Sequence, residues 1–263
     1  MSDSLAEIEF LAGSPYRIEV LQALTDDAYT RRELGDAVDA SQPTIGRVLR
    51  DLAERHWIAY DGERYRATAT GELVEAGITD LQDRLETETR LRDVIPWLPT
   101  EAMDVSLQAF SDATITTPSG TRPNAPIQRM VELLEEADTA LLLSHSFNRH
   151  KLDLLSERVT DGTLTAKGVF SADAIDAIVE TPELSQRLRE INDAAGASIR
   201  VASEEVPLAM EVTDDRTHLL LRDEEGLVRA SIDTDDERVR AWAADVHERY
   251  WERATPIDSA EIG

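Results

Sequence analysis

The stretch Thr30–Gly71 decides the fold of the first part of the chain and reads TRRELGDAVDASQPTIGRVLRDLAERHWIAYDGERYRATATG. Thr30 stands three residues before Glu33, a spacing typical of a capping box at the start of a short helix. Ser41 is placed to cap a second helix, which continues to about His56 because apolar residues recur along it at helical spacing. The sequence therefore predicts two helices joined by a tight turn.

A hairpin follows the second helix, and a further helix precedes the first. The runs Trp57–Tyr60 and Arg64–Ala67 flank an Asp-Gly turn, which is a strong signal for a two-stranded hairpin. Upstream, Ser14 is placed to cap a helix whose first residue is Pro15. Three helices followed by a hairpin form a winged helix-turn-helix, and this fold is predicted for residues 1–70.

The same segment resembles the DNA-binding domain of archaeal ArsR-like and MarR-like transcription regulators over about residues 10–75. The turn, the helix caps, the apolar positions and the wing all fall in the register of those domains. The resemblance implies a domain that binds double-stranded DNA with the helix Ser41–His56 in the major groove. Three-helix units with a hairpin also serve as protein-docking modules, and the residues leave that alternative open.

Polar and basic side chains gather at the start of this recognition helix, on the preceding helix and in the hairpin. Gln bonds adenine and Arg bonds guanine in a bidentate manner, each for about 1–3 kcal/mol of discrimination between bases. The residues expected to form the DNA-contacting surface are Thr30, Arg31, Arg32, Ser41, Gln42, Pro43, Thr44, Arg47, Arg50, Arg64 and Arg66. The alternative is that the arginines pair with Asp51, Glu54 and Glu63 on a solvated surface.

The chain is strongly acidic and almost free of lysine. It has 53 acidic and 27 basic residues, for a net charge of −26, and only Lys151 and Lys167 are lysines. This composition resembles that of proteins from extreme halophiles, in which concentrated salt screens an acidic surface; the alternative is an acidic interaction protein. Residues 1–75 hold 8 basic and 15 acidic side chains, so non-specific binding to DNA is expected to be weak. Specificity must then come from base contacts, DNA shape and dimer geometry.

Several kinds of protein are disfavoured by what the sequence lacks. No apolar run approaches the roughly 18 residues of a membrane span, and no signal sequence is visible, so we expect a cytoplasmic protein that contacts no membrane. The absence of cysteine excludes disulfides and thiolate chemistry. Neither metal-ligand spacing of histidines nor a Gly-rich phosphate loop occurs, so no metal and no cofactor is expected.

Residues 71–98 are expected to form a connecting helix that ends near Pro96 and Pro99. Its leucines recur between charged residues, as in a helix with one apolar face. Most soluble oligomers are two-fold dimers, and helix-turn-helix proteins usually read paired half-sites on DNA. We therefore expect this helix to pair with its copy in a homodimer, although a mere spacer is the alternative.

Beyond Pro99 strand-like and helical patterns alternate, which predicts a mixed or mostly parallel sheet flanked by helices over residues 99–263. The expected strands are 104–116, 139–144, 164–170, 198–202, 207–212, 217–222 and 227–232. The expected helices are 127–137, 150–159, 172–179, 183–194 and 235–254. The predicted fold class is thus an N-terminal winged helix-turn-helix, a connecting helix and a C-terminal mixed α/β sensing domain.

Three segments of this second domain, APIQRMVELLEEADTALLLSHSFN, VPLAMEVTDDRTHLLLRDEEG and AADVHERYWERA, resemble the effector domain of FilR1-type archaeal regulators. They are more distantly similar to the sensor domain of TrmB-type sugar regulators, whose fold is related to half of a phospholipase D. That enzyme family requires a His-x-Lys pair, whereas this chain has only the adjacent His150 and Lys151. The resemblance implies the fold without the catalysis, so we do not expect an enzyme.

Polar residues after the strand 139–144 are the leading candidates for an effector site, because ligands of α/β sheets bind outside the carboxyl ends of strands. A polar loop before the helix 127–137 is placed to close over them. The candidate effector-binding residues are Thr117, Ser119, Arg122, Ser144, His145, Ser146, Asn148 and Lys151. The alternative is a capped helix start beside an ordinary loop.

The sequence therefore predicts a homodimeric, sequence-specific transcription regulator that binds DNA and responds to a small molecule in its C-terminal domain. Two other functions remain open at this point: a phosphodiesterase-like enzyme fused to a DNA-binding domain, and a winged helix that docks proteins.

Overall fold

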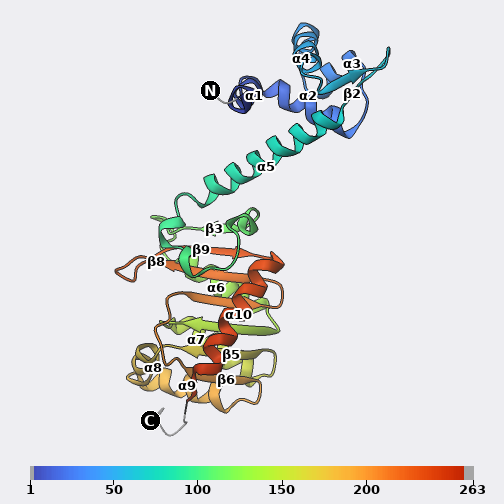
Figure 1. Cartoon of the computed structure of the whole chain (residues 1–263). Coiled ribbons are helices and arrows are strands. Elements are labelled where there is room, and N and C mark those ends of the chain that lie inside the picture. Colours follow the sequence, from blue (N-terminus) through green and yellow to red (C-terminus); the bar gives the residue numbers. More distant parts are fainter. Residues whose placement is uncertain (1–2, 258–263) are drawn as a thin grey trace. The chain divides into compact units, whose positions relative to one another are not determined.

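The computed structural model describes residues 3–257 and divides into two compact units, Met1–Glu86 and Thr87–Gly263 (Figure 1). The long helix α5, Ala69–Leu91, begins in the first unit and ends in the second. No helix within residues 3–257 is long and apolar enough to cross a membrane.

The N-terminal unit contains the predicted helices and hairpin. Its elements are α1 (Asp3–Ala12), α2 (Pro15–Asp26), α3 (Arg31–Ala37), α4 (Gln42–Glu54), β1 (Ile58–Tyr60), β2 (Tyr65–Ala67) and the start of α5. The capping box predicted at Thr30 is present: the Glu33 amide donates to the Thr30 hydroxyl, and the Thr30 amide donates to the Glu33 carboxylate. Asp39, at the corner before α4, has φ +47°, and the Ala40 amide closes the turn on the Gly35 carbonyl at 3.0 Å.

One predicted cap is wrong. Ser14 precedes α2 and Pro15 is the first helical residue, but the Ser14 side chain accepts no hydrogen bond from the helix. A cap would accept from the amide of the second or third helical residue, but the Arg17 amide, the third, donates to the Ser14 carbonyl at 3.0 Å instead. Burial of Leu21 and Leu24 against the other helices therefore holds α2 in place.

The N-terminal core lies between α2, α3 and α4 and extends under the hairpin. Its most buried side chains, all inaccessible to solvent, are Val20, Leu21, Leu34, Ile45 and Leu52. The start of α5 is fixed against the hairpin through Gly71, where a Cβ would overlap the carbonyl oxygen of Trp57. Only glycine fits at that close approach, so Gly71 fixes where α5 begins relative to the hairpin.

The C-terminal unit is built on one eight-stranded sheet with the strand order β10-β6-β5-β4-β7-β8-β9-β3 (Figure 1). Strands β4, β5 and β6 are parallel, and the other pairs are antiparallel. The strands are β3 (Thr114–Thr116), β4 (Thr139–Ser144), β5 (Thr165–Phe170), β6 (Ala197–Val201), β7 (Ala209–Thr213), β8 (Thr217–Arg222), β9 (Val228–Thr234) and β10 (Thr255–Pro256). The predicted fold class, a winged helix-turn-helix followed by a mixed α/β domain, is confirmed.

Helices cover both faces of this sheet and divide its core in two. The helices α6 (Ala125–Glu136), α7 (Arg149–Thr160), α8 (Ala172–Val179) and α9 (Pro182–Asp193) pack on one face. The other face is covered by α10 (Glu237–Arg253) together with short 3-10 turns from residues 95–110. Side chains of opposite faces alternate along β4, so Leu142 joins the first core and Leu143 the second.

The strand predicted for residues 104–116 is wrong for most of its length. Residues Leu107–Phe110 form a 3-10 turn whose first amides are capped by the Ser106 hydroxyl, and only Thr114–Thr116 pair with β9. The buried residues Ala109, Phe110 and Ala113 recur at helical spacing rather than at every second position. The buried positions of this segment therefore follow the period of a helix and not the two-residue period of a strand.

Candidate functional sites

The helix α4 presents one apolar and one basic face. Ile45, Val48, Leu49 and Leu52 are buried. The Ser41 hydroxyl accepts from the Thr44 amide at 3.4 Å and lies 2.9 Å from the Thr44 hydroxyl, so the cap predicted for this helix is confirmed. With the apolar face turned inward, other residues of the helix, including Arg47 and Arg50, project into solvent.

The first turns of α3 and α4 are joined by two side chains from the predicted contact surface. The Arg31 guanidinium donates to the Gln42 carbonyl, and the Gln42 amide nitrogen donates to the Arg31 carbonyl at 3.3 Å. Gln42 also packs so closely over Gly35 that a Cβ there would collide with it. Both side chains are exposed, but in this state they bind each other's backbone rather than pointing freely outward.

The wing is fastened to the body of the domain by Arg64. Its guanidinium donates to the Ala28 carbonyl at 2.7 Å and pairs with Glu33 at 3.1 Å. The Asp61 side chain accepts from the Glu63 and Arg64 amides within the hairpin turn, and these hydrogen bonds hold the pKa of Asp61 below its usual value. Arg64 thus orients the hairpin, while Arg66 on β2 remains exposed.

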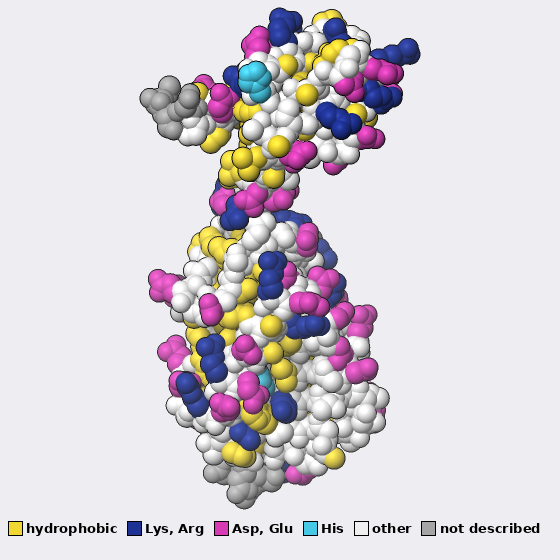
Figure 2. Space-filling model, turned by 45° about the vertical axis from the view of Figure 1, so that its right-hand side comes forward, with side chains coloured by type: hydrophobic (Ala, Val, Ile, Leu, Met, Phe, Trp, Pro, Cys, Tyr) yellow, Lys and Arg dark blue, Asp and Glu magenta, His cyan; other side chains and the backbone are white. Residues whose placement is uncertain are grey.

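Four arginines of the predicted surface are exposed and unpaired. Arg32 lies on α3, Arg47 and Arg50 on α4, and Arg66 on β2. Within residues 3–257 none of the four makes an ion pair or a side-chain hydrogen bond, whereas Arg17, Arg55 and Arg84 of the same unit each pair with a carboxylate. Asp51, one of the acids weighed as a partner for the α4 arginines, is 3.3 Å from Arg17 instead. Basic side chains stand out on this unit in Figure 2.

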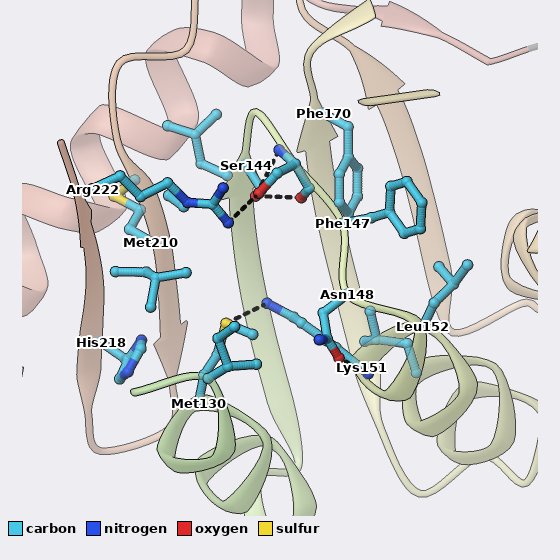
Figure 3. A pocket seen from close by; sticks show the side chains of 16 residues that line it. Met130, Ser144, Phe147, Asn148, Lys151, Leu152, Phe170, Met210, His218 and Arg222 are labelled. Atoms are coloured by element: carbon cyan, nitrogen blue, oxygen red, sulfur yellow. Dashed lines mark hydrogen bonds between the residues drawn. The ribbon is translucent and has the colours of Figure 1, made fainter. Parts of the chain in front are cut away.

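A cavity of about 60 Å³ lies in the C-terminal unit between the sheet and the helices α6 and α7 (Figure 3). The side chains around it are mostly apolar and come from β4, β5, β7 and β8 as well as from the two helices. They are Ile127, Met130, Leu143, Ser144, Ser146, Phe147, Asn148, Lys151, Leu152, Leu155, Phe170, Ala209, Met210, His218, Leu220 and Arg222.

The strand order explains why Ser144 and Arg222 meet at this cavity. β7 is antiparallel to β4, and β8 is antiparallel to β7, so β8 runs in the same direction as β4. Ser144 is the last residue of β4 and Arg222 the last residue of β8, and both carboxyl ends reach the same edge of the sheet. There the Arg222 guanidinium donates to the Ser146 hydroxyl at 2.7 Å, and the Ser144 hydroxyl donates to the Ser146 carbonyl at 2.7 Å.

A buried ion pair stands beside the cavity. The Lys151 ammonium lies 2.6 Å from the Glu211 carboxylate, and the two side chains are 11% and 1% exposed. His218 is paired in register with Glu211 on the neighbouring strand and is buried as well. Burial, followed by the nearby Lys151 charge, lowers the pKa of His218 to about 3, so its ring is neutral at pH 7.

The structure brings together four of the eight predicted effector residues. Ser144, Ser146, Asn148 and Lys151 line the cavity, and the Asn148 side chain also caps α7 by accepting from the Lys151 amide at 3.0 Å. The other four do not line it. His145 points into a separate open groove, where burial and Arg222 lower its pKa. Thr117, Ser119 and Arg122 lie exposed in the loop before α6, because Ser119 and Arg122 bond each other across a local turn instead of folding over the sheet.

Arg222, His218 and Glu211 belong to the cavity or its wall but were not among the predicted residues. A signal for two of them exists in the sequence: Glu211 stands between apolar residues in β7, and His218 precedes the three leucines of β8. Buried polar side chains of this kind require partners or serve a site. Within residues 3–257 no three His, Asp or Glu side chains converge as the ligands of a metal ion would.

Two family models match the chain. Residues 5–90 match the HVO_A0261 N-terminal domain, and residues 123–253 match the middle domain of the methanogenesis regulatory protein FilR1. No curated protein sequence matches the chain significantly.

Solved structures with a similar arrangement share little sequence with the chain. TrmBL2, an archaeal chromatin protein, is 19% identical with a TM-score of 0.45, over 93% of this chain and 94% of that one. The phospholipase D family member Nuc from Salmonella typhimurium is 9% identical with a TM-score of 0.44, over 56% of this chain and 99% of its own. The resemblance stated from the sequence agrees with the two family models: residues 123–253 belong to the family of the FilR1 middle domain, and residues 5–90 belong to that of the HVO_A0261 N-terminal domain.

Proposed function

We propose that the protein is a sequence-specific, DNA-binding transcription regulator whose helix α4 reads the major groove. The observation that carries this proposal is the set of exposed, unpaired arginines on α3, α4 and β2, in a chain whose net charge is −26. An arginine without a carboxylate partner is available to a phosphate or to the edge of a guanine. A protein-docking winged helix has no need of unpaired positive charge on these elements.

The regulator acts as a homodimer in this proposal, and exposed leucines on α5 support it. Leu73, Leu81 and Leu85 are 73%, 38% and 54% exposed and, at multiples of four residues, share one side of the helix. Contiguous apolar surface of this kind usually marks a contact with another molecule. A two-fold pair places two α4 helices on successive half-sites of a palindromic operator.

Control by a small molecule is the second part of the proposal. The C-terminal cavity is the candidate effector site, and α5 is the covalent connection from that unit to the winged helix. An effector changes DNA affinity only by binding one arrangement of the dimer more tightly than the other. Regulation rather than catalysis is also supported by the lack of a His-x-Lys pair anywhere in the sequence.

The test begins with selection of duplexes from a random DNA library by the full-length protein in concentrated salt. Binding of the selected duplex is then measured for Arg47→Ala and Arg50→Ala. Loss of a base contact costs about 1–3 kcal/mol, so affinity should fall by roughly 5- to 150-fold while the thermal unfolding curve stays unchanged. Arg84→Ala is the matched control, because Arg84 is an exposed arginine on α5 that pairs with Asp80. A failure to enrich any sequence, or equal losses in all three variants, would contradict the proposal.

A further inference from the structure

We propose that the C-terminal cavity binds a small monocarboxylate, with its carboxylate against Arg222 and Ser146 and its hydrocarbon body among the apolar side chains of α6, α7 and β5. This inference deepens the proposed function, on which it rests for its regulatory meaning, by naming the chemical class of the effector. The binding itself is a property of the C-terminal unit and is measured without DNA.

Among the described residues, Arg222 lacks a carboxylate at ion-pair distance, although Glu204, Glu205, Asp223 and Glu224 line the open groove that Arg222 also borders. Within residues 3–257 no carboxylate forms an ion pair with it, and the adjacent acid, Asp223, pairs with Arg229 at 2.6 Å. The Arg222 Nε is buried and has no hydrogen-bond partner, while its other nitrogens donate only to Ser146 and to the Gly226 carbonyl. Burial lowers the pKa of Arg222. A desolvated guanidinium in this situation favours an anion.

The remaining charges around the cavity cancel. Lys151 and Glu211 neutralise each other at 2.6 Å. His218 is an uncharged ring at pH 7, and neither of its nitrogens makes a well-formed hydrogen bond. His145 lies on the other side of Arg222, and its pKa is lowered by burial and by that arginine, so it adds no charge at pH 7. Among the described residues that line the cavity, Arg222 is therefore the one charge without an ion-pair partner, and a monoanion supplies that partner.

Donors other than Arg222 converge on the same end of the cavity. The Ser144 and Ser146 hydroxyls lie beside the guanidinium, and Asn148 caps the 12-residue helix α7, whose N-terminus borders the cavity. The helix dipole adds a positive potential at that end. In Figure 3 Arg222 and Lys151 reach toward the centre of the cavity from β8 and α7. The Ser144 hydroxyl donates its hydrogen to the Ser146 carbonyl, whereas the Ser146 hydroxyl accepts from Arg222 and keeps its own hydrogen to donate. A carboxylate placed beside Arg222 is thus met by the Ser146 hydroxyl and a helix start.

Size and polarity define the rest of the ligand. Beyond the polar end the cavity is lined by Met130, Leu152, Leu155 and Phe170, side chains with no hydrogen bonds to offer a sugar or a phosphate ester. A volume of about 60 Å³ is well below the roughly 300–1,000 Å³ of sites for drug-sized ligands. Monocarboxylates of two or three carbons match these limits, whereas a polyanion brings more charge than Arg222 balances.

The experiment is calorimetric titration of the full-length protein, without DNA, with acetate and propionate. Acetamide and propionamide serve as neutral analogues of the same shape, and inorganic phosphate is a third probe. We expect at least one of the two carboxylates to bind, its amide to bind at least tenfold more weakly, and phosphate to bind no better than the amide. Equal binding of acid and amide, binding of phosphate alone, or no binding of either carboxylate would overturn the proposal.

Two arginine variants test whether the carboxylate binds in the cavity. Arg222→Met keeps the apolar stem and removes the charge, and it should weaken carboxylate binding at least tenfold while leaving the weak amide binding unchanged. Arg238→Met is the matched control, because Arg238 is a 63% exposed arginine that pairs with Asp236 at the start of α10, on the opposite face of the sheet. If Arg222→Met fails to fold, the comparison of carboxylate binding with amide binding in the natural protein still tests whether the protein selects a negatively charged ligand. Carboxylate binding that Arg222→Met leaves intact would reject the assigned site.

The two proposals fail separately. Selection of a DNA sequence together with no carboxylate binding would reject the ligand class and leave the DNA-binding regulator standing. Carboxylate binding in a protein that selects no DNA would do the opposite. If both bind, adding the carboxylate should shift the affinity for the selected duplex, and the shift should disappear in Arg222→Met.

Discussion

Arg32, Arg47, Arg50 and Arg66 of the N-terminal unit differ from Arg129 of the C-terminal unit in exposure and in pairing. In the N-terminal unit, Arg32, Arg47, Arg50 and Arg66 are exposed and unpaired among the described residues. In the C-terminal unit, Arg129 donates to Asp233 through two nitrogens at 3.1 and 3.0 Å, and Asp233 is fully buried. An exposed cation is hydrated and free to meet a partner from outside, whereas a buried carboxylate depends on a cation supplied by the fold.

This difference separates arginines that stabilise the fold from arginines that are available to bind another molecule. Arg222 falls between the two groups, since it is partly buried like the structural arginines but unpaired like those of the winged helix. Its position is explained if its partner arrives as a ligand. Variants that alter each kind of charge should therefore affect the free energy of unfolding by very different amounts.

The largest effect is expected at Arg129. Arg129→Ala leaves the buried Asp233 with Arg216 alone, at 3.4 Å from one carboxylate oxygen. Breaking a buried pair typically costs about 3–5 kcal/mol, and we expect a loss near the lower end because Arg216 still faces the Asp233 carboxylate. Urea denaturation followed by circular dichroism measures the change.

The reciprocal variant sharpens that prediction. Asp233→Ala removes the buried charge itself, and the two arginines that remain are 30% and 32% exposed, so they reach water. Its loss of stability should be smaller than that of Arg129→Ala. The reverse order would show that Asp233 is not the charge that needs compensation.

A smaller effect, with a defined pH window, is expected from His218. Its folded pKa of about 3 lies below the ordinary value of 6.5, since burial and Lys151 outweigh the opposing influence of Asp233. Between those two pH values unfolding takes up a proton, so this residue makes stability fall by about 1.4 kcal/mol per unit as the pH falls. From pH 6.5 to 5.0 the natural protein should lose about 2 kcal/mol more than His218→Leu.

The measurement is urea denaturation of both proteins at the two pH values. His150→Gln is the control, because His150 is an exposed histidine on α7 and should lose stability in parallel with the natural protein. If the natural protein and His218→Leu decline equally, then His218 is not held neutral in the folded state.

The N-terminal fold was predictable because its determinants are local in sequence. The box of Thr30 and Glu33, the Ser41 cap and the Asp-Gly hairpin each lie within a few residues, and each is present in the structure. What local reasoning missed is the use of Gln42 and Arg64 to hold elements together. Both residues bond groups that are distant in sequence, so only the packed domain reveals these contacts.

The part of the cavity that follows β4 could be predicted for the same reason. Ser144, Ser146 and Asn148 follow a strand that its apolar pattern identifies, and the rule for carboxyl ends of strands then applies. Arg222 required knowledge that β8 lies two strands from β4 and runs parallel to it, an order that no local pattern encodes. The loop residues precede α6 in the sequence, but the Ser119 hydroxyl accepts from the Arg122 backbone amide within a local turn.

A moderate effect should distinguish the two predicted helix caps of the N-terminal unit. Ser41→Ala removes a hydroxyl that accepts from the Thr44 amide, and such a loss typically costs about 1 kcal/mol. Ser14→Ala removes a hydroxyl that makes no capping bond, so it should leave the unfolding midpoint in urea unchanged. Equal losses in the two variants would mean that the Ser41 hydrogen bond contributes nothing.

The smallest change in stability is expected where the charges are exposed and unpaired. Arg32→Gln and Arg66→Gln remove no ion pair and no hydrogen bond among residues 3–257, so the free energy of unfolding should stay within about 0.5 kcal/mol of its natural value. Their effect should appear in binding instead. If each arginine neutralises one phosphate, the slope of log affinity against log salt for the selected duplex should fall by about 0.9 per variant. Stability lost without a change of slope would assign these arginines to the fold and would remove the contrast between the two units.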